Sequence, residues 1–85
     1  MKMNPSDTQY VGMPYYHPPM HMTLGQKIKY HRKYLGIKQQ EMADMVGVSR
    51  QILHKYESDI CEPSFFITAC IANVLGLTLD YLAWG

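Results

Sequence analysis

Four polar side chains that can form specific hydrogen bonds lie within the stretch GVSRQILHKYESD, residues 47–59. Ser49 can accept a hydrogen bond from a free N–H group of a first helical turn, so we expect a helix to begin there. Leu53 and Tyr56 are three residues apart and mark the buried side of that helix. The polar side chains left on its other sides are those of Arg50, Gln51, His54 and Lys55.

The chemistry of these side chains suits the reading of DNA. Arginine can bond guanine, and glutamine can bond adenine, through two hydrogen bonds in the major groove. Lys55 carries a flexible point charge that suits a phosphate better than a base. Ile52 borders the same face, where it could contact a thymine methyl group or simply pack inward. Surface helices also often carry such residues without any partner, so this helix alone leaves DNA binding and a solvated face both open.

The charges of the chain are segregated along the sequence. The net charge is only +1, which is low for a nucleic-acid-binding domain. Residues 24–56 nevertheless hold seven basic and two acidic side chains, whereas residues 57–85 hold four acidic side chains and no lysine or arginine. The low average hides this division, which predicts two different tasks for the two halves.

Composition and motifs exclude several classes of protein. The 47% hydrophobic content of the 85 residues is ordinary for one small globular domain. No run of about 18 apolar residues could span a membrane, and no secretory signal is evident. Two cysteines without a CxxC motif favour a reduced, cytoplasmic setting. No nucleophile, base and orienting group can be assembled, and no phosphate loop occurs. We therefore expect neither an enzyme nor a bound metal or cofactor.

Proline content and helical spacing divide the chain into an arm and a domain. Residues 1–22 hold four of the five prolines, so we expect an extended arm there. Residues 23–85 contain five helical segments and no convincing strand, which predicts an all-α bundle. The expected helices cover residues 24–35, 39–46, 49–57, 64–75 and 79–84. A capping-box pattern of Thr23 and Gln26 starts the first helix, and its expected inward residues are Leu24, Ile28 and Leu35.

The segment from Gln39 to Tyr56 carries the signature of a helix-turn-helix. Ala43 is small where two helices must cross closely, and Gly47 lies four residues on, where the backbone must turn sharply. The wider run of residues 24–85, including LGIKQQEMA and LGLTLDYL, resembles the phage repressor and Cro-like (Xre-type) helix-turn-helix family throughout. This resemblance implies a five-helix, lambda-repressor-like domain from a bacterial or phage-encoded regulator.

The resemblance also implies roles for individual residues. Gln39 matches a family position that touches the DNA backbone and supports the recognition helix. Arg50, Gln51 and Lys55 match positions that face the major groove or its phosphates. The full set that we expect to face DNA is Gln39, Ser49, Arg50, Gln51, Ile52, His54 and Lys55.

The residues around the end of the third expected helix include one match to the family and one departure from it. The resemblance implies that Arg32 and Glu57 pair, which ties the first helix to the end of the third. Asp59 stands where the family commonly has glycine, and aspartate can adopt the left-handed geometry. Residues 60–62 replace basic residues that hold phosphate, so we expect a weaker electrostatic grip and a greater dependence on the two half-sites of a dimer.

The fourth expected helix is apolar on more than one side. Its expected inward stripe is Phe65, Thr68, Ile71, Ala72 and Leu75. The second stripe lies where the family usually has polar residues, and we expect it to form a dimer or partner interface. That interface consists of Phe66, Ile67, Cys70 and Val74, joined by Tyr81 and Trp84. Candidates to cover it are a second subunit, a different protein and the N-terminal arm.

Two functions are consistent with these features. The first is a sequence-specific DNA-binding transcription regulator, a repressor in its simplest mode, that acts as a homodimer on an inverted-repeat operator. The alternative is a protein-interaction module, such as an antitoxin or adaptor, that binds a partner through the apolar fourth helix and the arm. The missing basic residues after Glu57 favour the alternative, whereas Arg50, Gln51 and Lys55 favour DNA binding.

Overall fold

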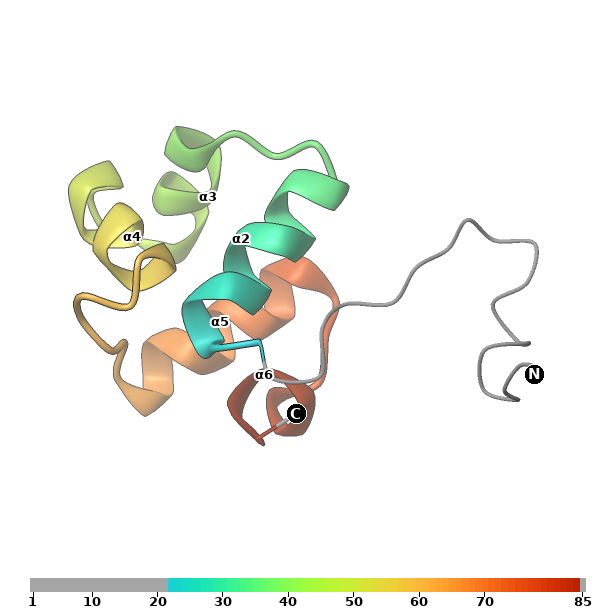
Figure 1. Cartoon of the computed structure of the whole chain (residues 1–85). Helices are drawn as coiled ribbons and strands as arrows, with labels where there is room; N and C mark the ends of the chain where they lie inside the picture. Colours follow the sequence, from blue (N-terminus) through green and yellow to red (C-terminus); the bar gives the residue numbers. More distant parts are fainter. Residues whose placement is uncertain (1–21, 85) are drawn as a thin grey trace, which may run out of the picture.

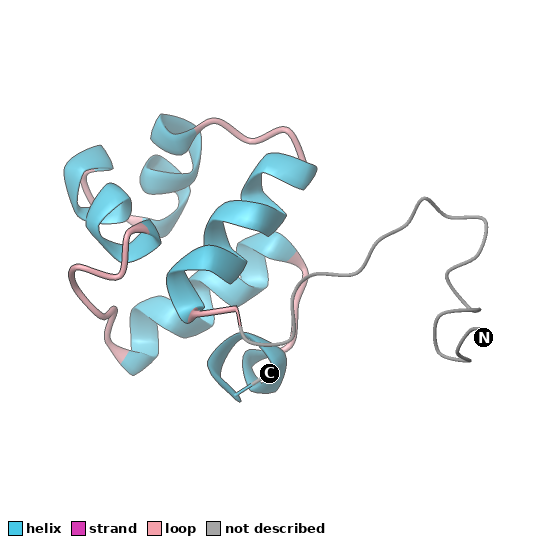
Figure 2. Ribbon diagram, viewed as in Figure 1, coloured by secondary structure: helices cyan, strands magenta, loops and turns pink. Residues whose placement is uncertain are grey.

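The computed structural model describes residues 22–84, which form five helices and no strand (Figures 1 and 2). The helices are α2 (Leu24–Tyr34), α3 (Gln39–Val46), α4 (Arg50–Glu57), α5 (Phe65–Leu75) and α6 (Leu79–Trp84). The predicted all-α fold is confirmed. The predicted arm, residues 1–22, lies outside the described residues except for Met22.

Local sequence signals determine where the helices begin and end. Thr23 caps α2, because its Oγ1 accepts from the backbone N–H of Gln26 at 3.1 Å while the Gln26 side chain accepts from the N–H of Thr23 at 2.9 Å. Ser49 and Ser64 accept from the third N–H of α4 and α5, at 3.1 Å in each case. Gly47 ends α3 in the left-handed conformation, with φ of 85°. These boundaries confirm the predicted helices to within a residue or two.

Every helix contributes one large, fully buried side chain to a single core. These side chains are Ile28, Met42, Leu53, Ile71 and Leu82. α2 packs against α4, α5 and α6, and α3 packs against α4 and α5. In Figure 1, α2 runs through the middle of the domain with α3 and α4 on one side and α6 at the opposite end. α4, the helix predicted to face DNA, is therefore held by the same core that holds the rest of the domain.

Two predictions of inward-facing residues are wrong. Leu35 is 49% exposed, because it lies one residue beyond α2, and Ile37 packs against the core in its place. Phe65 is 76% exposed, although the later members of its stripe are buried. Phe65 is the first residue of α5, and helical side chains lean toward the N-terminus of their helix. Its ring therefore extends beyond the end of the core.

Candidate nucleic-acid interface

α3, a tight turn and α4 form the unit that carries the residues predicted to face DNA. The N–H groups of Gly47 and Val48 both donate to the carbonyl oxygen of Ala43, at 2.8 and 3.0 Å. These bonds close the end of α3, and Ser49 starts α4 two residues after Gly47. Ala43 is fully buried, and its small side chain allows α3 and α4 to pack closely. The turn therefore fixes the angle between the two helices.

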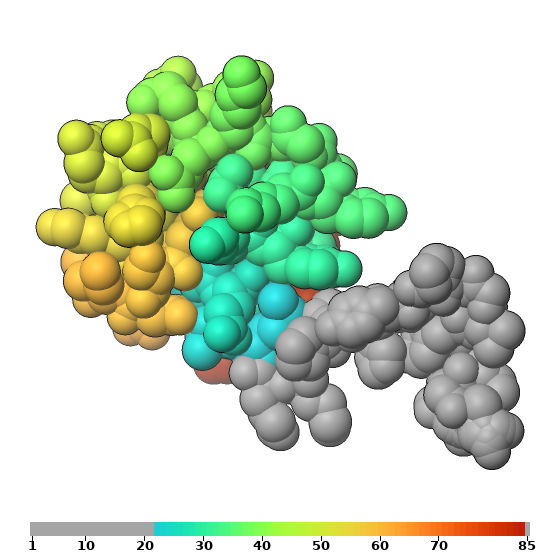
Figure 3. All heavy atoms as spheres, turned by 45° about the horizontal axis from the view of Figure 1, so that its top comes forward, coloured from blue at the N-terminus to red at the C-terminus, as the bar shows by residue number. Residues whose placement is uncertain are grey.

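α4 has a clear inner and outer face. Leu53 and Glu57 are buried, and Ile52 and Tyr56 are half-buried. The four polar side chains singled out from the sequence are all exposed: Arg50, Gln51, His54 and Lys55. In the space-filling view, the yellow-green and yellow side chains of this region project at the upper left of the domain (Figure 3). The outer face is therefore accessible to a large partner.

A chain of hydrogen bonds runs from the buried side of α4 to its outer face. Arg32 Nε donates to Glu57 Oε2 at 2.6 Å, and Arg32 Nη2 donates to Oε1 at 3.1 Å, with both side chains buried. Gln39 Nε2 donates to the same Oε1 at 3.1 Å. Arg50 Nη1 in turn donates to Gln39 Oε1 at 3.4 Å. Glu57 thereby orients the Gln39 amide, whose oxygen then faces Arg50.

Lys27 has a structural role that sequence reasoning missed. Its ammonium group donates to the carbonyl oxygens of Tyr81 at 2.9 Å and Leu82 at 3.4 Å, and it lies 5.0 Å from the centre of the Tyr81 ring. A cation beside carbonyl oxygens near the end of a helix is stabilising. Lys27 therefore fastens α6 to α2. Lys27 and Arg32 are both buried, so the exposed basic residues of this half are Lys29, Lys33, Lys38, Arg50 and Lys55.

His31 and Tyr81 form a second link between α2 and α6. The His31 Nε2 and the Tyr81 hydroxyl oxygen are 3.1 Å apart, and the rings meet edge to face. Partial burial lowers the pKa of His31, because it disfavours the charged imidazolium. Burial also raises the pKa of Tyr81, and Tyr30 adds to that rise. Both shifts favour the neutral forms, and the His31 ring serves packing between α2 and α6.

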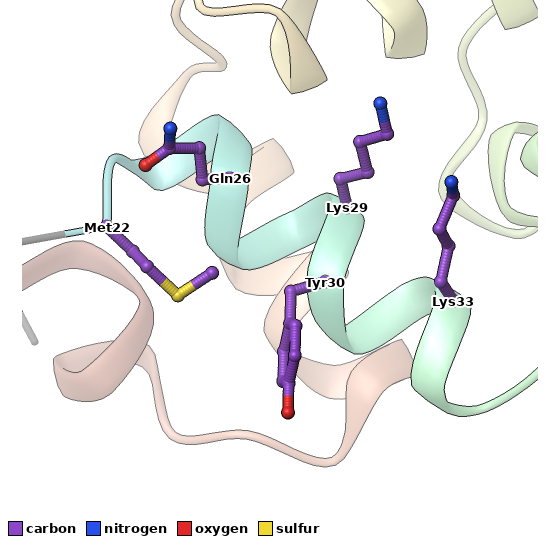
Figure 4. Close-up of a pocket in the computed structure, with 5 residues that line it drawn as sticks. All are labelled: Met22, Gln26, Lys29, Tyr30 and Lys33. Atoms are coloured by element: carbon purple, nitrogen blue, oxygen red, sulfur yellow. The ribbon is translucent and has the colours of Figure 1, made fainter. Parts of the chain in front are cut away.

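An open hollow of about 360 Å³ lies on the surface of α2 (Figure 4). Met22 and Tyr30 point to one side of the helix, whereas Lys29 and Lys33 point to the other. Gln26 completes the lining. No residue of α3 or α4 lines this hollow, so it is separate from the face predicted to bind DNA.

The loop between α4 and α5 offers little to a phosphate group. Asp59 has φ of 60°, which confirms the predicted left-handed geometry. The N–H groups of Ile60 and Cys61 already donate to the carbonyl oxygen of Lys55, at 2.9 and 3.3 Å. The side chains of residues 60–62 are exposed, and none is basic. A weak grip on the DNA backbone stays a prediction, and this geometry favours it.

The second apolar stripe of α5 is partly covered by the domain itself. Ile67, Cys70 and Val74 are half-buried and pack against the core. Phe66 is 70% exposed and Trp84 is 82% exposed. From residue 60 onward, the exposed large apolar side chains are Ile60, Phe65, Phe66 and Trp84. The surface available to a partner therefore differs from the predicted stripe.

Within residues 22–84, no group of three or more histidine, cysteine, aspartate or glutamate side chains is placed to hold a metal ion. No helix in the same range is long and apolar enough to cross a membrane.

The five helices, with the tight turn between α3 and α4, define a helix-turn-helix domain of the phage-repressor type. The P22 c2 repressor, solved in complex with a synthetic operator, superposes with a TM-score of 0.73 at 31% identity, over 76% of this chain and 98% of that one. SinR of Bacillus subtilis, solved in complex with DNA, superposes with a TM-score of 0.66 at 30% identity, over 71% of this chain and 97% of that one.

The chain belongs to the helix-turn-helix family, whose sequence model matches residues 28–82. An SPbeta prophage-derived, uncharacterized HTH-type transcriptional regulator of Bacillus subtilis, YonR, is 38% identical over 61 residues. An uncharacterized HTH-type transcriptional regulator of Methanothermobacter thermautotrophicus is 43% identical over 49 residues, covering 58% of this chain and 71% of that protein. The match with YonR covers 72% of this chain but only 56% of YonR. Membership of this family agrees with the expectation that the chain is not an enzyme.

Proposed function

We propose that this chain is a sequence-specific DNA-binding domain of a transcription regulator, and in the simplest mode a repressor. This proposal rests on the outer face of α4. Its exposed polar side chains lie on a helix whose inner face is fixed by Leu53 and Glu57. The fold is similar to that of two proteins whose solved structures include DNA. Repression follows when the bound domain occupies DNA that polymerase needs.

The DNA contact proposed for each residue follows from its side-chain chemistry. Arg50, in the exposed first turn of α4, bonds a guanine, and Gln51 bonds an adenine. Gln39 orients Arg50 through its oxygen and keeps one amide hydrogen free for a phosphate. Ser49 accepts from α4 with its hydroxyl oxygen, so its hydrogen remains available to a phosphate. Lys55 supplies a phosphate contact, and His54 and Ile52 border the same face.

Two alanine substitutions on α4 should have different signatures. Gln51→Ala is expected to weaken operator binding by about 1–3 kcal/mol and to relax specificity at one base pair. Lys55→Ala should weaken binding to all sequences equally and reduce the slope of log affinity against log salt by about 1. Selection of bound sites from random DNA, followed by titration at several salt concentrations, measures both. Lys33→Ala, an exposed lysine of α2, is the matched control. Equal, small losses from all three variants would mean that the face is only solvated.

We further propose that the domain acts as a homodimer. Two copies related by a twofold axis would place their α4 helices in successive major grooves, about 34 Å apart on an inverted repeat. The scarcity of basic residues after Glu57 makes a single domain a weak binder. Joining two half-sites raises the apparent affinity by about 10²–10⁴-fold, which compensates for that weakness.

Phe66→Glu should separate the two subunits if the exposed start of α5 lies in the dimer interface. A buried carboxylate would face the apolar surface of the other copy, at a high cost in free energy. Sedimentation should then give a monomer mass, and affinity for the inverted repeat should fall toward that for one half-site. Tyr34→Glu, at a similarly exposed aromatic residue on α2, is the control and should keep the dimer. An unchanged mass for the Phe66 variant would reject this interface.

A second function is favoured by a different observation. The exposed apolar side chains of Ile60, Phe65, Phe66 and Trp84 suit a protein partner. SinR has also been solved in a complex with the protein SinI. An antitoxin or adaptor would use this surface, and DNA binding would be secondary. The random-DNA selection separates the two, because a protein-interaction module would select no sequence at moderate salt.

A further inference from the structure

Asp59 forms contacts that its position in a surface loop does not suggest. It lies two residues beyond α4 and is the only residue other than glycine with positive φ within residues 22–84. Its Oδ1 accepts from the backbone N–H of Gly25 at 3.0 Å, and its Oδ2 accepts from the Thr23 hydroxyl at 2.6 Å. Both carboxylate oxygens therefore bind the first turn of α2, where a negative charge is favourable.

The backbones of α2 and α4 approach closely at this junction. A Cβ atom on Gly25 would lie 2.4 Å from the carbonyl oxygen of Tyr56 and 2.7 Å from that of Glu57. Only glycine permits such an approach without a shift of one backbone. The bonds of Asp59 therefore join two segments that are already in contact, and they fix one end of α2 against the last turn of α4.

A second attachment holds the same turn of α4. Arg32, on α2, binds Glu57 through two hydrogen bonds. Gly25 and Arg32 are seven residues apart, which is roughly 10 Å along a helix. Leu53 and α3 also hold α4, and two separated attachments to α2 resist a rotation of α4 relative to α2 better than one attachment does. α4 has 8 residues, so it is roughly 12 Å long, and a tilt of a few degrees at its C-terminal end displaces Arg50 by a fraction of an ångström to about one ångström.

We propose that Asp59 is a positioning residue for DNA recognition: by bonding Thr23 and Gly25 it sets the angle between α2 and the recognition helix α4. This inference rests on the proposed function, because it assumes that Arg50 and Gln51 read bases. Base-reading side chains must be held to about 0.5 Å and 10–20° to keep their hydrogen bonds. A glycine at position 59 would adopt the same backbone geometry, but it would leave the first turn of α2 without its carboxylate.

The central variant is therefore Asp59→Gly, which keeps the left-handed turn and removes the carboxylate together with its two hydrogen bonds. At a temperature where the variant is fully folded, we expect about tenfold weaker binding to the selected operator and reduced discrimination against single-base changes. The salt slope should stay unchanged, because no phosphate contact is lost. Amide hydrogen exchange at Gly25 should become at least about tenfold faster.

Conservative and matched variants separate positioning from other roles. Asp59→Asn retains an oxygen acceptor for Gly25 and tolerates positive φ, so it should restore most of the discrimination. Thr23→Val removes the hydroxyl that donates to Asp59 and also caps α2, so it is compared at a temperature where it is folded and should reproduce part of the loss. Thr23→Ser, which keeps the hydroxyl, should not. If the Asp59→Gly protein melts earlier but discriminates normally when folded, the residue is only structural and the proposal is overturned. Tighter binding to all DNA with a steeper salt slope would also overturn it, because the carboxylate would then act only by repelling phosphates.

A failure of the proposed function can be told apart from a failure of this inference. If the unmodified chain selects no DNA, the proposed function fails. The positioning role of Asp59 is then judged from the orientation of α4 relative to α2, measured by residual dipolar couplings in the unmodified chain and in Asp59→Gly. A changed orientation supports that role, and an unchanged orientation together with unchanged exchange at Gly25 overturns it.

Discussion

Replacing Glu57 with alanine is expected to lower the free energy of unfolding by about 3–5 kcal/mol, the cost of leaving a buried charge without its partner. The Arg32 side chain is only 8% exposed, so bulk water has little access to the guanidinium that would lose its carboxylate. Its Nη1 would keep one bond, to the carbonyl oxygen of Ile37 at 2.8 Å. Gln39 would lose its acceptor as well. Small domains have a total stability of about 5–15 kcal/mol, so this single change should remove a large fraction of it.

Chemical denaturation followed by far-UV circular dichroism measures this effect. The informative control is the double variant Arg32→Met with Glu57→Met, which removes both charges and fills a similar volume. Because the attraction of a buried pair is largely offset by the cost of its desolvation, the double variant should recover most of the stability lost by Glu57→Ala. A single variant that loses no more than about 1 kcal/mol would instead mean that the pair behaves like an exposed one.

The ends of the helices can be predicted because their signals are local. The hydroxyl groups of Thr23, Ser49 and Ser64 cap the first turns that directly follow them, and Gly47 adopts positive φ at the residue where α3 ends. Helical spacing also predicts the outer face of α4 correctly, because Leu53 alone is enough to mark the inner side. Exposure of that face is confirmed, and its contact with bases stays a prediction.

The contacts that fasten α4 and α6 to α2 cannot be predicted in this way. Gly25 and Asp59 are 34 positions apart, and Lys27 and Tyr81 are 54 positions apart. No local pattern marks Lys27 as buried, because lysine is usually exposed. Asp59 differs from the common glycine of the family, and only the folded chain reveals that its carboxylate has two donors. The pairing of Arg32 with Glu57 was expected only through the resemblance to a family.

The apolar surface that is open to a partner cannot be predicted from the spacing of residues in α5 alone. Periodicity identifies which sides of α5 are apolar, but the identity of the covering element depends on the path of the chain after Gly76. α6 packs against α5, and Ile67, Cys70 and Val74 are half-buried against the core, so the domain covers part of the second stripe itself. The exposed apolar surface then moves to the start of α5, where Phe65 and Phe66 both face solvent. Because Phe65 faces solvent and not the core, the exposed apolar surface at the start of α5 is larger than the sequence predicts.

Leu53→Ala should be the other highly destabilising change, at about 2–5 kcal/mol. Leu53 is fully buried and is the residue of α4 that enters the core alongside Ile28, Met42, Ile71 and Leu82. Truncating it removes apolar contacts and leaves a cavity under α4. The melting temperature of the variant, measured by calorimetry, should fall by roughly 10 °C or more for a domain of this size.

Ile52→Ala, at the preceding residue, is the matched comparison and decides between the two roles open to Ile52. This residue is half-buried and lies between the core and the outer face. If it only packs, its truncation should cost stability and leave the preferred operator unchanged. If it contacts a thymine methyl group, the variant should lose preference for thymine at one operator position, as measured by selection from random DNA. Leu53→Ala, tested while folded at low temperature, should keep the unmodified preference, because its effect is on the core beneath α4 and not on the outer face proposed to contact bases.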